Sequence, residues 1–351
     1  MSAAWGRGIV FVSLLAVFFS MLGITGGLVV IDQSGPLAND ISFVVERGDT
    51  FTAVASRLDE QGALPQVSVL GGRELLLGSA AALGMASDLK AGENENPQGR
   101  RVRDNLRIIT SGKGVQRSIT IPEGWTVWQV VARLTASDHL SGEIVAIPPE
   151  GTVMPNTYFV ILGEDRQAVL DRMTAAHQTL FDTLWAGRAA DLPYRDRQEA
   201  LIMASIIERE TGLSNERGLV ASVYVNRLVD GWRLQADPTV IYGITNGQQP
   251  LRRGLRRSEL LDADNPYNTY QIHGLPPGPI ANPSAESIAA ALNPERSDFY
   301  FFVASCDGGH EFSTTLEEHN RAVAAYRECE ASLSAPALPK QRPVSPAYVG
   351  F

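Results

Sequence analysis

The apolar run at residues 8–31, which contains no charged residue, constrains this chain more than any other feature. A helix rises about 1.5 Å per residue, so this run can cross a hydrocarbon layer of roughly 30 Å. A cleavable signal peptide normally has an apolar stretch of only about 7–15 residues, and no small-x-small cleavage site follows directly here. A buried helix of a soluble core would not need apolar residues on every side. The run therefore favours a single retained transmembrane helix.

The flanking charges predict the orientation of that helix. Arg7 precedes the run, Asp32 and Asp40 follow it, and the next basic residue is Arg47. Basic residues collect on the cytoplasmic side of membrane proteins. We therefore expect residues 1–7 in the cytoplasm, a linker over residues 32–40, and the remainder of the chain on the outer side.

Charge and residue counts exclude several classes of protein. The 30 basic and 39 acidic residues give a net charge of −9, which argues against bulk electrostatic binding of nucleic acid. The five histidines form no HExxH motif, and the two cysteines form no CxxC, so we expect neither a metal site nor a cofactor. Cys306 and Cys329 either pair outside the membrane or remain as two buried thiols, and the sequence leaves both possibilities open.

Two segments of the first outer module have similar sequences. Residues 48–58 resemble residues 124–134: each begins with a glycine turn and a threonine that can cap a helix, followed by apolar residues at helical spacing. Each also follows a β-branched or alternating stretch. We expect two strand–turn–helix segments in a small α+β module over residues 41–160, with a turn-rich loop at 92–99.

The downstream region predicts a mixed α/β domain over residues 161–331 and a disordered tail at 332–351. The predicted elements, in chain order, are helices over 165–190 and 196–230, turns and short strands over 232–282, a helix over 284–292 capped by Ser284, a strand over 299–304, and a last helix ending near 331 that opens with the capping box of Thr315 and Glu318. The expected fold class is therefore α+β.

One carboxylate falls on an apolar helix face. At roughly 100° per residue, Glu210 projects to the same side as Met203, Ile206 and Ile207, whereas Glu208 projects away and is expected to face solvent. Removing a carboxyl from water raises its pKa, and a carboxyl that is protonated near neutral pH can act as a general acid. Periodicity alone also allows a helix-end glutamate without a catalytic role.

The stretch 265–283 combines rigid turn residues with tyrosines. Long ordered loops of this kind often carry binding sites. Tyr267 and Tyr270 offer ring faces suited to sugars, and Asn268 offers an amide donor and acceptor. A loop that is held only by its own tyrosines is the alternative.

Several motifs together resemble the endolytic murein transglycosylases of the MltG/YceG type. They occur in the family's order: MASIIERETG, VASVYVNRL, LQADPTVIYG, YNTYQIHGLPPGPIANP and GGHEFSTT followed by HN. The resemblance is strong over residues 200–330 and weaker elsewhere. It implies a single-pass enzyme of the bacterial inner membrane whose periplasmic part, including a LysM-like module, cuts peptidoglycan strands. It also implies that nascent strands are terminated beside peptidoglycan synthases.

The family pattern places its catalytic glutamate at the second glutamate of the IIExET segment, which is Glu210. The implied reaction is cleavage of the β-1,4 bond from N-acetylmuramic acid to N-acetylglucosamine, leaving a 1,6-anhydro end. The residues expected to line the groove are Asn226, Gln235, Asp237, Tyr267, Asn268 and Tyr270. A membrane-tethered peptidoglycan-binding scaffold that does not cut remains the alternative, which the two echoed segments favour.

Two departures from the family pattern are visible. Lys90-Ala91-Gly92 runs into ENENP without the usual aromatic residue, which puts the local strand in doubt. The family's Pro-Asp-Thr-Tyr appears here with Asn156 in place of the acid, so any role of that acid is missing.

Overall fold

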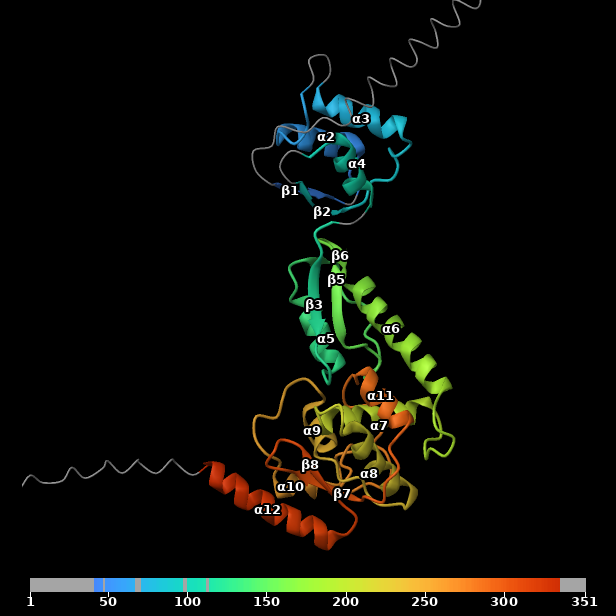
Figure 1. The fold of residues 1–351 in the computed structure, drawn as a ribbon, viewed down its shortest axis with the longest axis vertical. Helices are drawn as coiled ribbons and strands as arrows, with labels where there is room; N and C mark the ends of the chain where they lie inside the picture. Colours follow the sequence, from blue (N-terminus) through green and yellow to red (C-terminus); the bar gives the residue numbers. More distant parts are fainter. Residues whose placement is uncertain (1–40, 47, 67–70, 97–99, 112–113, 335–351) are drawn as a thin grey trace, which may run out of the picture. The chain divides into compact units, whose positions relative to one another are not determined.

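The computed structural model describes residues 41–46, 48–66, 71–96, 100–111 and 114–334 (Figure 1). These residues form two compact units. Unit 1 contains the described residues up to Ile119, together with Thr135–Glu143 and Thr157–Val169. Unit 2 contains Thr120–Leu134, Ile144–Asn156 and the described residues from Leu170 onward.

Unit 1 packs three helices against a two-stranded antiparallel sheet. Its elements up to residue 111 are β1 (Ile41–Val45), α2 (Phe51–Glu60), α3 (Gly72–Ala82), β2 (Gly92–Asn96) and α4 (Val102–Ser111). The sheet pairs Ile41 with Asn96 and Val45 with Gly92. A buried apolar cluster that includes Phe43, Leu58 and Leu106 joins the helices to the sheet. The hydrophobic spacing of α2 and α4 therefore leads to a small α+β core.

Strand β2 corrects the expectation of a loop at residues 92–99. The segment GENEN carries no β-forming run, yet its backbone pairs along the whole length of β1. The side chain of Asn94 is buried and donates to the carbonyl of Gly92 at 3.0 Å, while Glu93 forms an ion pair with Arg117. Backbone pairing and these polar contacts determine the strand here, because β propensity is a weak and context-dependent preference.

Both predicted strand–turn–helix segments are present. In the first, Gly48 has a φ of +90° and Thr50 caps α2 through its hydroxyl. In the second, β3 (Arg117–Ile121) is followed by Gly124 at a φ of +70° and by α5 (Val127–Thr135). The short strands β4 (Leu140–Ser141), β5 (Asn156–Val160) and β6 (Glu164–Asp165) complete the pairs β3–β5 and β4–β6.

Unit 2 is mainly helical. In chain order its elements are α5 up to Leu134, the greater part of α6 (Arg166–Ala186), then α7 (Arg197–Glu210), α8 (Arg217–Val229), α9 (Asp237–Thr245), α10 (Arg257–Leu260), α11 (Ala285–Leu292), β7 (Phe301–Ala304), β8 (His310–Ser313) and α12 (Leu316–Ser334). Strands β7 and β8 form an antiparallel hairpin. The predicted caps are confirmed at Ser284 for α11 and in the box of Thr315 and Glu318 for α12.

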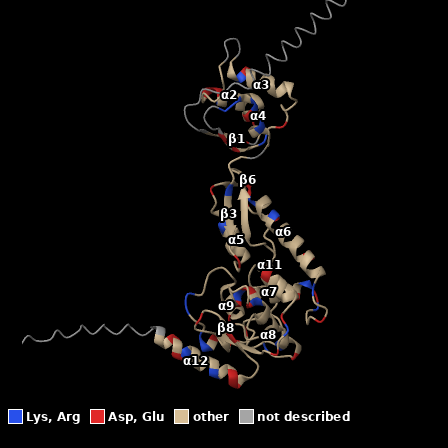
Figure 2. Cartoon of the chain, in the orientation of Figure 1, with Lys and Arg blue, Asp and Glu red and all other residues tan. Residues whose placement is uncertain are grey.

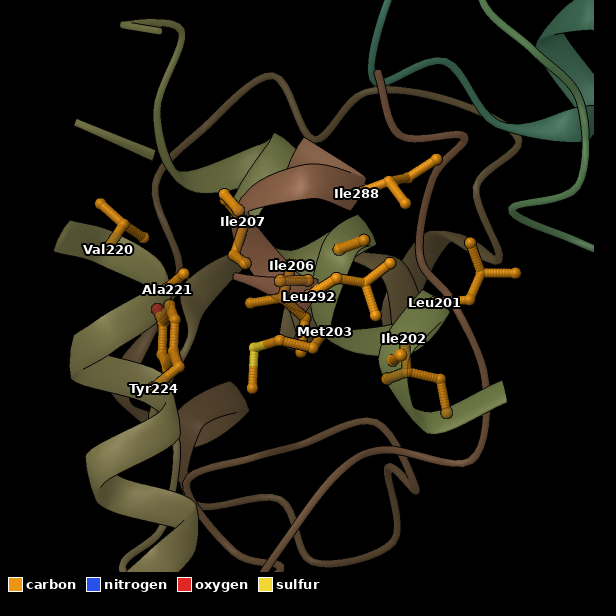
Figure 3. Packing of buried hydrophobic residues seen from close by; sticks show 14 of the residues in the cluster. Leu201, Ile202, Met203, Ile206, Ile207, Val220, Ala221, Tyr224, Ile288 and Leu292 are labelled. Atoms are coloured by element: carbon orange, nitrogen blue, oxygen red, sulfur yellow. The ribbon is translucent and has the colours of Figure 1, made fainter. Parts of the chain in front are cut away.

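Helix α7 is the centre of the core of unit 2. Asp196 caps it by accepting from the amide of Glu199 at 3.0 Å, and every residue from 200 to 207 is buried. Figure 3 shows the side chains of α7 meeting those of α8 and α11, among them Met203, Tyr224 and Ile288. A helix that is buried nearly all round holds its terminal residues in a fixed place, which matters for Glu210.

The expectation of short strands between residues 232 and 282 is wrong for the stretch that forms α9. Asp237 and Pro238 open this helix, since proline at a first helical position fits its fixed φ and leaves no hydrogen bond unmade. Asn246 ends the helix with a φ of +49°. The apolar run TVIYGI therefore belongs to a helix, and short apolar runs do not distinguish helix from strand by periodicity.

The compact units divide the chain differently from the boundary expected at residue 160. Residues 124–127 and 150–153 belong to unit 2 because polar contacts tie them to its loops. The side chain of Asn282 donates to the carbonyl of Trp125 at 2.8 Å and accepts from the amide of Val153 at 2.9 Å. The carboxylate of Glu150 accepts from the amide of Val127 at 2.8 Å.

The predicted transmembrane helix at 8–31 and most of the predicted tail lie outside the described residues. Within the described ranges, none of the helices combines the length and apolar character needed to cross a membrane. The last helix continues to Ser334, three residues beyond the predicted end at 331. A disulfide joins Cys306 to Cys329, the pairing that the sequence left open.

Acidic and basic side chains are interspersed along the described elements (Figure 2). Helix α12 illustrates the pattern, since it carries both signs of charge along its length. Mixed charge of this kind keeps a surface soluble without creating one dominant field.

Candidate active site

Glu210 is the last residue of α7, and its side chain is only partly exposed. The hydroxyl of Tyr224, on the neighbouring helix α8, donates to Oε1 of Glu210 at 2.6 Å. Tyr224 itself is 2% exposed, so this hydroxyl needs an internal partner. Among the described residues, no hydrogen bond engages Oε2 of Glu210. One carboxyl oxygen is therefore held in place while the other is available for a ligand.

Burial raises the pKa of Glu210 from 4.5 to about 7, because the charged carboxylate loses hydration. The hydrogen bond from Tyr224 acts in the opposite direction, since it stabilises the charged form. The negative charge of Asp237 raises the pKa further, while the positive charges of His310 and Arg227 lower it. The result is a carboxyl that exchanges its proton near neutral pH, which is the property that a general acid–base group requires.

Arg227 is a buried cation close to this carboxyl. Its Nε donates to the carbonyl of Tyr300 at 2.8 Å and its Nη1 to the carbonyl of Leu234 at 2.5 Å, and its guanidinium lies 5.5 Å from the ring centre of Phe301. Burial lowers the pKa of Arg227, because the charged guanidinium is also desolvated. Arg227 therefore fixes the strand and loop around the site and contributes positive charge to it.

Asp237 and Tyr270 form a second polar pair that acts on Glu210. The hydroxyl of Tyr270 donates to Oδ1 of Asp237 at 2.6 Å. Burial raises the pKa of Tyr270, and the charges of Asp237 and Glu210 add to this increase. The structure thus brings together three of the predicted site residues: Glu210, Asp237 and Tyr270.

His310, at the start of β8, is paired with Glu216, the N-cap residue of α8. Its Nδ1 lies 2.6 Å from Oε2 of Glu216, and its backbone amide donates to Oε1 at 2.9 Å. Glu216 is 8% exposed and also accepts from the hydroxyl of Thr211, the residue after Glu210, at 3.5 Å. This pair ties the β7–β8 hairpin to the end of α7.

The expectation that Glu208 faces solvent is wrong. Its side chain is 5% exposed, and Oε2 accepts from both the amide and the hydroxyl of Ser284, at 2.9 and 2.5 Å. The guanidinium of Arg217 lies 3.8 Å away. Helix α11 packs against this side of α7, so the face opposite Glu210 is covered as well. Glu208 therefore anchors the start of α11.

Two predicted groove residues have structural roles instead. Asn268 is fully buried, and its amide donates to the carbonyls of Glu259, Leu260 and Asp262, so it does not line a groove. The amide of Asn226 donates to the carbonyls of Ser297 and Phe299, both at 2.9 Å. Asparagine suits both positions because its amide can satisfy several carbonyls of irregular backbone.

Tyr267 and Gln235 occupy intermediate positions. The centre of the Tyr267 ring lies 4.9 Å from the centre of the Tyr242 ring on α9. Tyr267 therefore packs against α9. Gln235 is exposed and has a φ of +56°, a left-handed conformation that is uncommon for a residue other than glycine. Its backbone amide donates to the carbonyl of Thr269 at 3.2 Å.

Tyr224 and Arg227 are site residues that the sequence reasoning missed. Both lie on the buried face of α8, three residues apart. A tyrosine and an arginine on an apolar face are the available signal, since each brings a polar group that needs a partner. The partner itself lies on another helix, and no sequence spacing identifies it.

The site contains no obvious metal-binding arrangement. Within the part of the chain that the structure describes, no three His, Cys, Asp or Glu side chains come together as ligands. The raised pKa of the buried Glu210 carboxyl suits that group to proton transfer.

A buried carboxyl that exchanges its proton near neutral pH is typical of enzymes that use general acid–base catalysis. Comparisons with known proteins show the family to which the chain belongs. The model of the YceG-like family matches residues 43–325. The chain therefore belongs to the YceG-like family. A solved structure of a YceG-like protein from Listeria monocytogenes is similar, with a TM-score of 0.50 and 26% sequence identity, covering 81% of this chain and 99% of that one.

Two curated relatives are both named endolytic murein transglycosylase. The protein from Bacillus subtilis (strain 168) is 44% identical over 126 residues, which are 36% of this chain and 34% of the relative. The protein from Streptococcus pneumoniae serotype 2 (strain D39 / NCTC 7466) is 25% identical over 369 residues, covering 90% of this chain and 65% of the relative. The match thus spans about a third of the length of the Bacillus subtilis protein and just under two thirds of the length of the Streptococcus pneumoniae protein.

Proposed function

We propose that this protein is an endolytic lytic transglycosylase that cleaves the β-1,4 bond from N-acetylmuramic acid to N-acetylglucosamine in peptidoglycan and leaves 1,6-anhydro ends. The observation that carries the proposal is the carboxyl of Glu210, whose pKa is raised to about 7 by burial. The names of the two curated relatives support the same activity. No metal or cofactor is required for this reaction.

The proposed mechanism uses Glu210 twice. The protonated carboxyl first gives its proton to the oxygen that leaves C1, while the sugar ring acquires oxocarbenium character. The resulting carboxylate then takes the proton of the muramyl 6-hydroxyl as that oxygen bonds to C1. Most glycosidases use two carboxylates around the bond. Here the hydroxyl of the substrate replaces water, so one carboxyl acts first as the acid and then as the base.

The surroundings of Glu210 suit this cycle. Tyr224 holds Oε1 through the 2.6 Å hydrogen bond and stabilises the carboxylate after the first proton transfer. The negative charge of Asp237 favours the protonated form of Glu210 that the first proton transfer requires. Arg227 supplies positive charge that limits how far the pKa rises. Opposing influences of this kind keep the carboxyl close to the pH at which both forms are populated.

The proposed location is the bacterial inner membrane. Residues 8–31 would form the single transmembrane helix, with the N-terminus in the cytoplasm and the site in the periplasm. The apolar run and its flanking charges support this arrangement. Nascent glycan strands, and the peptidoglycan synthases that make them, would then be the partners, and residues 41–160 would include the LysM-like module.

Product analysis tests the function. Purified sacculi are incubated with the full chain in detergent, and soluble products are separated and weighed. Anhydro ends identify a lytic transglycosylase. Products heavier by one water, with reducing ends, identify a hydrolase and contradict the proposal. Binding to sacculi without any product identifies a scaffold that does not cut, and also contradicts it.

A further inference from the structure

A cavity of about 260 Å³ lies in unit 2, and two of its lining residues adjoin residues of the candidate active site in the sequence. Arg209, which precedes Glu210, and Pro238, which follows Asp237, are both part of its wall. The other lining residues are Gly124, Trp125, Thr126, Gln129, Ile241, Tyr242, Thr245, Gly247, Gln249, Pro250, Leu251 and Ile280. The cavity is therefore formed where the turn at residues 124–126 meets the end of α7 and the side of α9.

The turn at residues 124–126 is firmly attached to unit 2. The carbonyl of Gly124 accepts from Nη1 of Arg209 at 3.3 Å, and the hydroxyl of Thr126 donates to the carbonyl of Gly247 at 2.6 Å. The carbonyl of Trp125 accepts from both the backbone amide and the side chain of Asn282, each at 2.8 Å. A wall held by this many contacts is pre-organised, which lowers the cost of binding a ligand.

The lining of the cavity is chemically mixed. Trp125 and Tyr242 provide aromatic surface, Gln129 and Gln249 provide amides, and Arg209 provides an exposed guanidinium. The hydroxyl of Tyr242 is turned away to Glu150 at 3.3 Å, so its ring rather than its hydroxyl is the feature offered to a ligand. Sugars combine apolar C–H faces with rings of hydroxyl groups, and this lining can satisfy both.

We propose that this cavity is a saccharide subsite that binds one sugar of the glycan strand away from the bond that is cut. This inference rests on the proposed function, because it assigns the cavity to the same substrate. The turn at residues 124–126, which echoes residues 48–50 of unit 1, thereby contributes to substrate binding in unit 2. The positive charge of Arg209 suits a strand whose muramyl residues carry a free lactyl carboxylate wherever the stem peptide has been removed.

Two tryptophans that lie three positions apart in the sequence, Trp125 and Trp128, provide a matched test. Trp125 lines the cavity, whereas Trp128 on α5 is 50% exposed and does not line it. In the full chain, Trp125→Ala should raise KM for glycan strands about tenfold and change kcat less than about twofold. This result is expected when the lost contact binds the substrate and the transition state equally well. Trp128→Ala should change neither value. Equal effects of both variants, or no effect of Trp125→Ala, would overturn the assignment.

A second matched pair covers the case in which Trp125→Ala does not fold. Gln249 lines the cavity and Gln248 does not, and both side chains are exposed. Gln249→Ala should raise KM by about threefold and Gln248→Ala should not, again as a loss of uniform binding. A Gln249→Ala variant with the KM of the unchanged protein would overturn the assignment.

Binding measurements separate this inference from the proposed activity. Titration calorimetry on the Glu210→Gln background uses glycan oligomers from which the stem peptides have been removed. Weaker binding by the Trp125→Ala double variant supports a sugar subsite even when the unchanged protein forms no product. If only peptide-bearing glycan distinguishes the variants, the cavity binds the peptide, and the saccharide assignment is wrong.

Discussion

The hydroxyl of Tyr224 donates to Oε1 of Glu210 at 2.6 Å, across the contact between α8 and α7. This contact explains how a desolvated carboxyl can remain useful. Burial alone would keep Glu210 protonated, and a group that never loses its proton cannot act as an acid. The hydrogen bond stabilises the charged form and so brings the pKa back toward neutrality.

Replacing Tyr224 by phenylalanine should move the pH dependence of activity. The proposed first step needs protonated Glu210, so activity should fall as the pH rises through about 7. Without the hydrogen bond, the pKa of Glu210 rises, and the alkaline limb of kcat/KM should move up by about one pH unit. A pH–rate profile measures this shift. An unchanged limb would show that the hydroxyl does not act on the titrating group.

Replacing Asp237 by asparagine should move the same limb in the opposite direction. The negative charge of Asp237 raises the pKa of Glu210, and asparagine removes that charge while its amide oxygen can still accept from Tyr270. The alkaline limb should therefore move to lower pH, by a fraction of a unit to about one unit. The comparison with Tyr224→Phe provides the control, because shifts of the same sign in both variants would contradict this electrostatic assignment.

The raised pKa of Glu210 predicts a cost in stability at high pH. Its value in the folded protein, about 7, lies above the ordinary value of 4.5, so the folded state holds the proton more tightly than the unfolded state does. Below pH 4.5 this proton contributes fully to the free energy of unfolding. The contribution, up to about 3 kcal/mol, is lost as the pH rises through 7.

Glutamine at position 210 cannot ionise and so avoids this loss. Glu210→Gln should therefore unfold at higher urea concentration than the unchanged protein at pH 8, and the advantage should disappear at pH 4.5. Urea unfolding at the two pH values measures the difference. An advantage of the same size at both values would mean that ionisation of Glu210 is not its cause.

Replacing Glu208 by glutamine should affect stability more than chemistry. Glu208 accepts two hydrogen bonds from Ser284 and faces Arg217, so loss of its charge should destabilise the unit by about 1–3 kcal/mol. Glu286→Gln is the matched control, since Glu286 is exposed in the first turn of α11, the helix that Ser284 caps. Thermal unfolding measures both variants. Loss of catalysis by Glu208→Gln without destabilisation would give Glu208 a role in the reaction.

Local sequence signals predicted much of the fold. The caps at Thr50 and Ser284 and the capping box of Thr315 and Glu318 are all present, because a cap depends only on the next few residues. Helix periodicity also placed Glu210 on the buried side of α7. Strand β2 could not be predicted in this way, since GENEN becomes a strand only through pairing with β1, which lies far away along the chain.

The site was predicted less completely than the fold. The apolar face of α7 identified Glu210, but it could not show that α11 covers the opposite face and buries Glu208. Asn268 was expected in a groove because its amide can bind sugars, and the structure uses that same capacity on backbone carbonyls. Residue chemistry predicts what a side chain can bind, whereas the tertiary arrangement decides which partner it meets.

The most direct test of the central claim compares the products of the unchanged full chain with those of Glu210→Gln on purified sacculi. Mass spectrometry should detect 1,6-anhydro ends with the unchanged protein. It should detect none with the variant, whose circular dichroism and binding to sacculi should remain unchanged. Anhydro ends formed at full rate by Glu210→Gln would contradict the assignment of the acid–base group to Glu210.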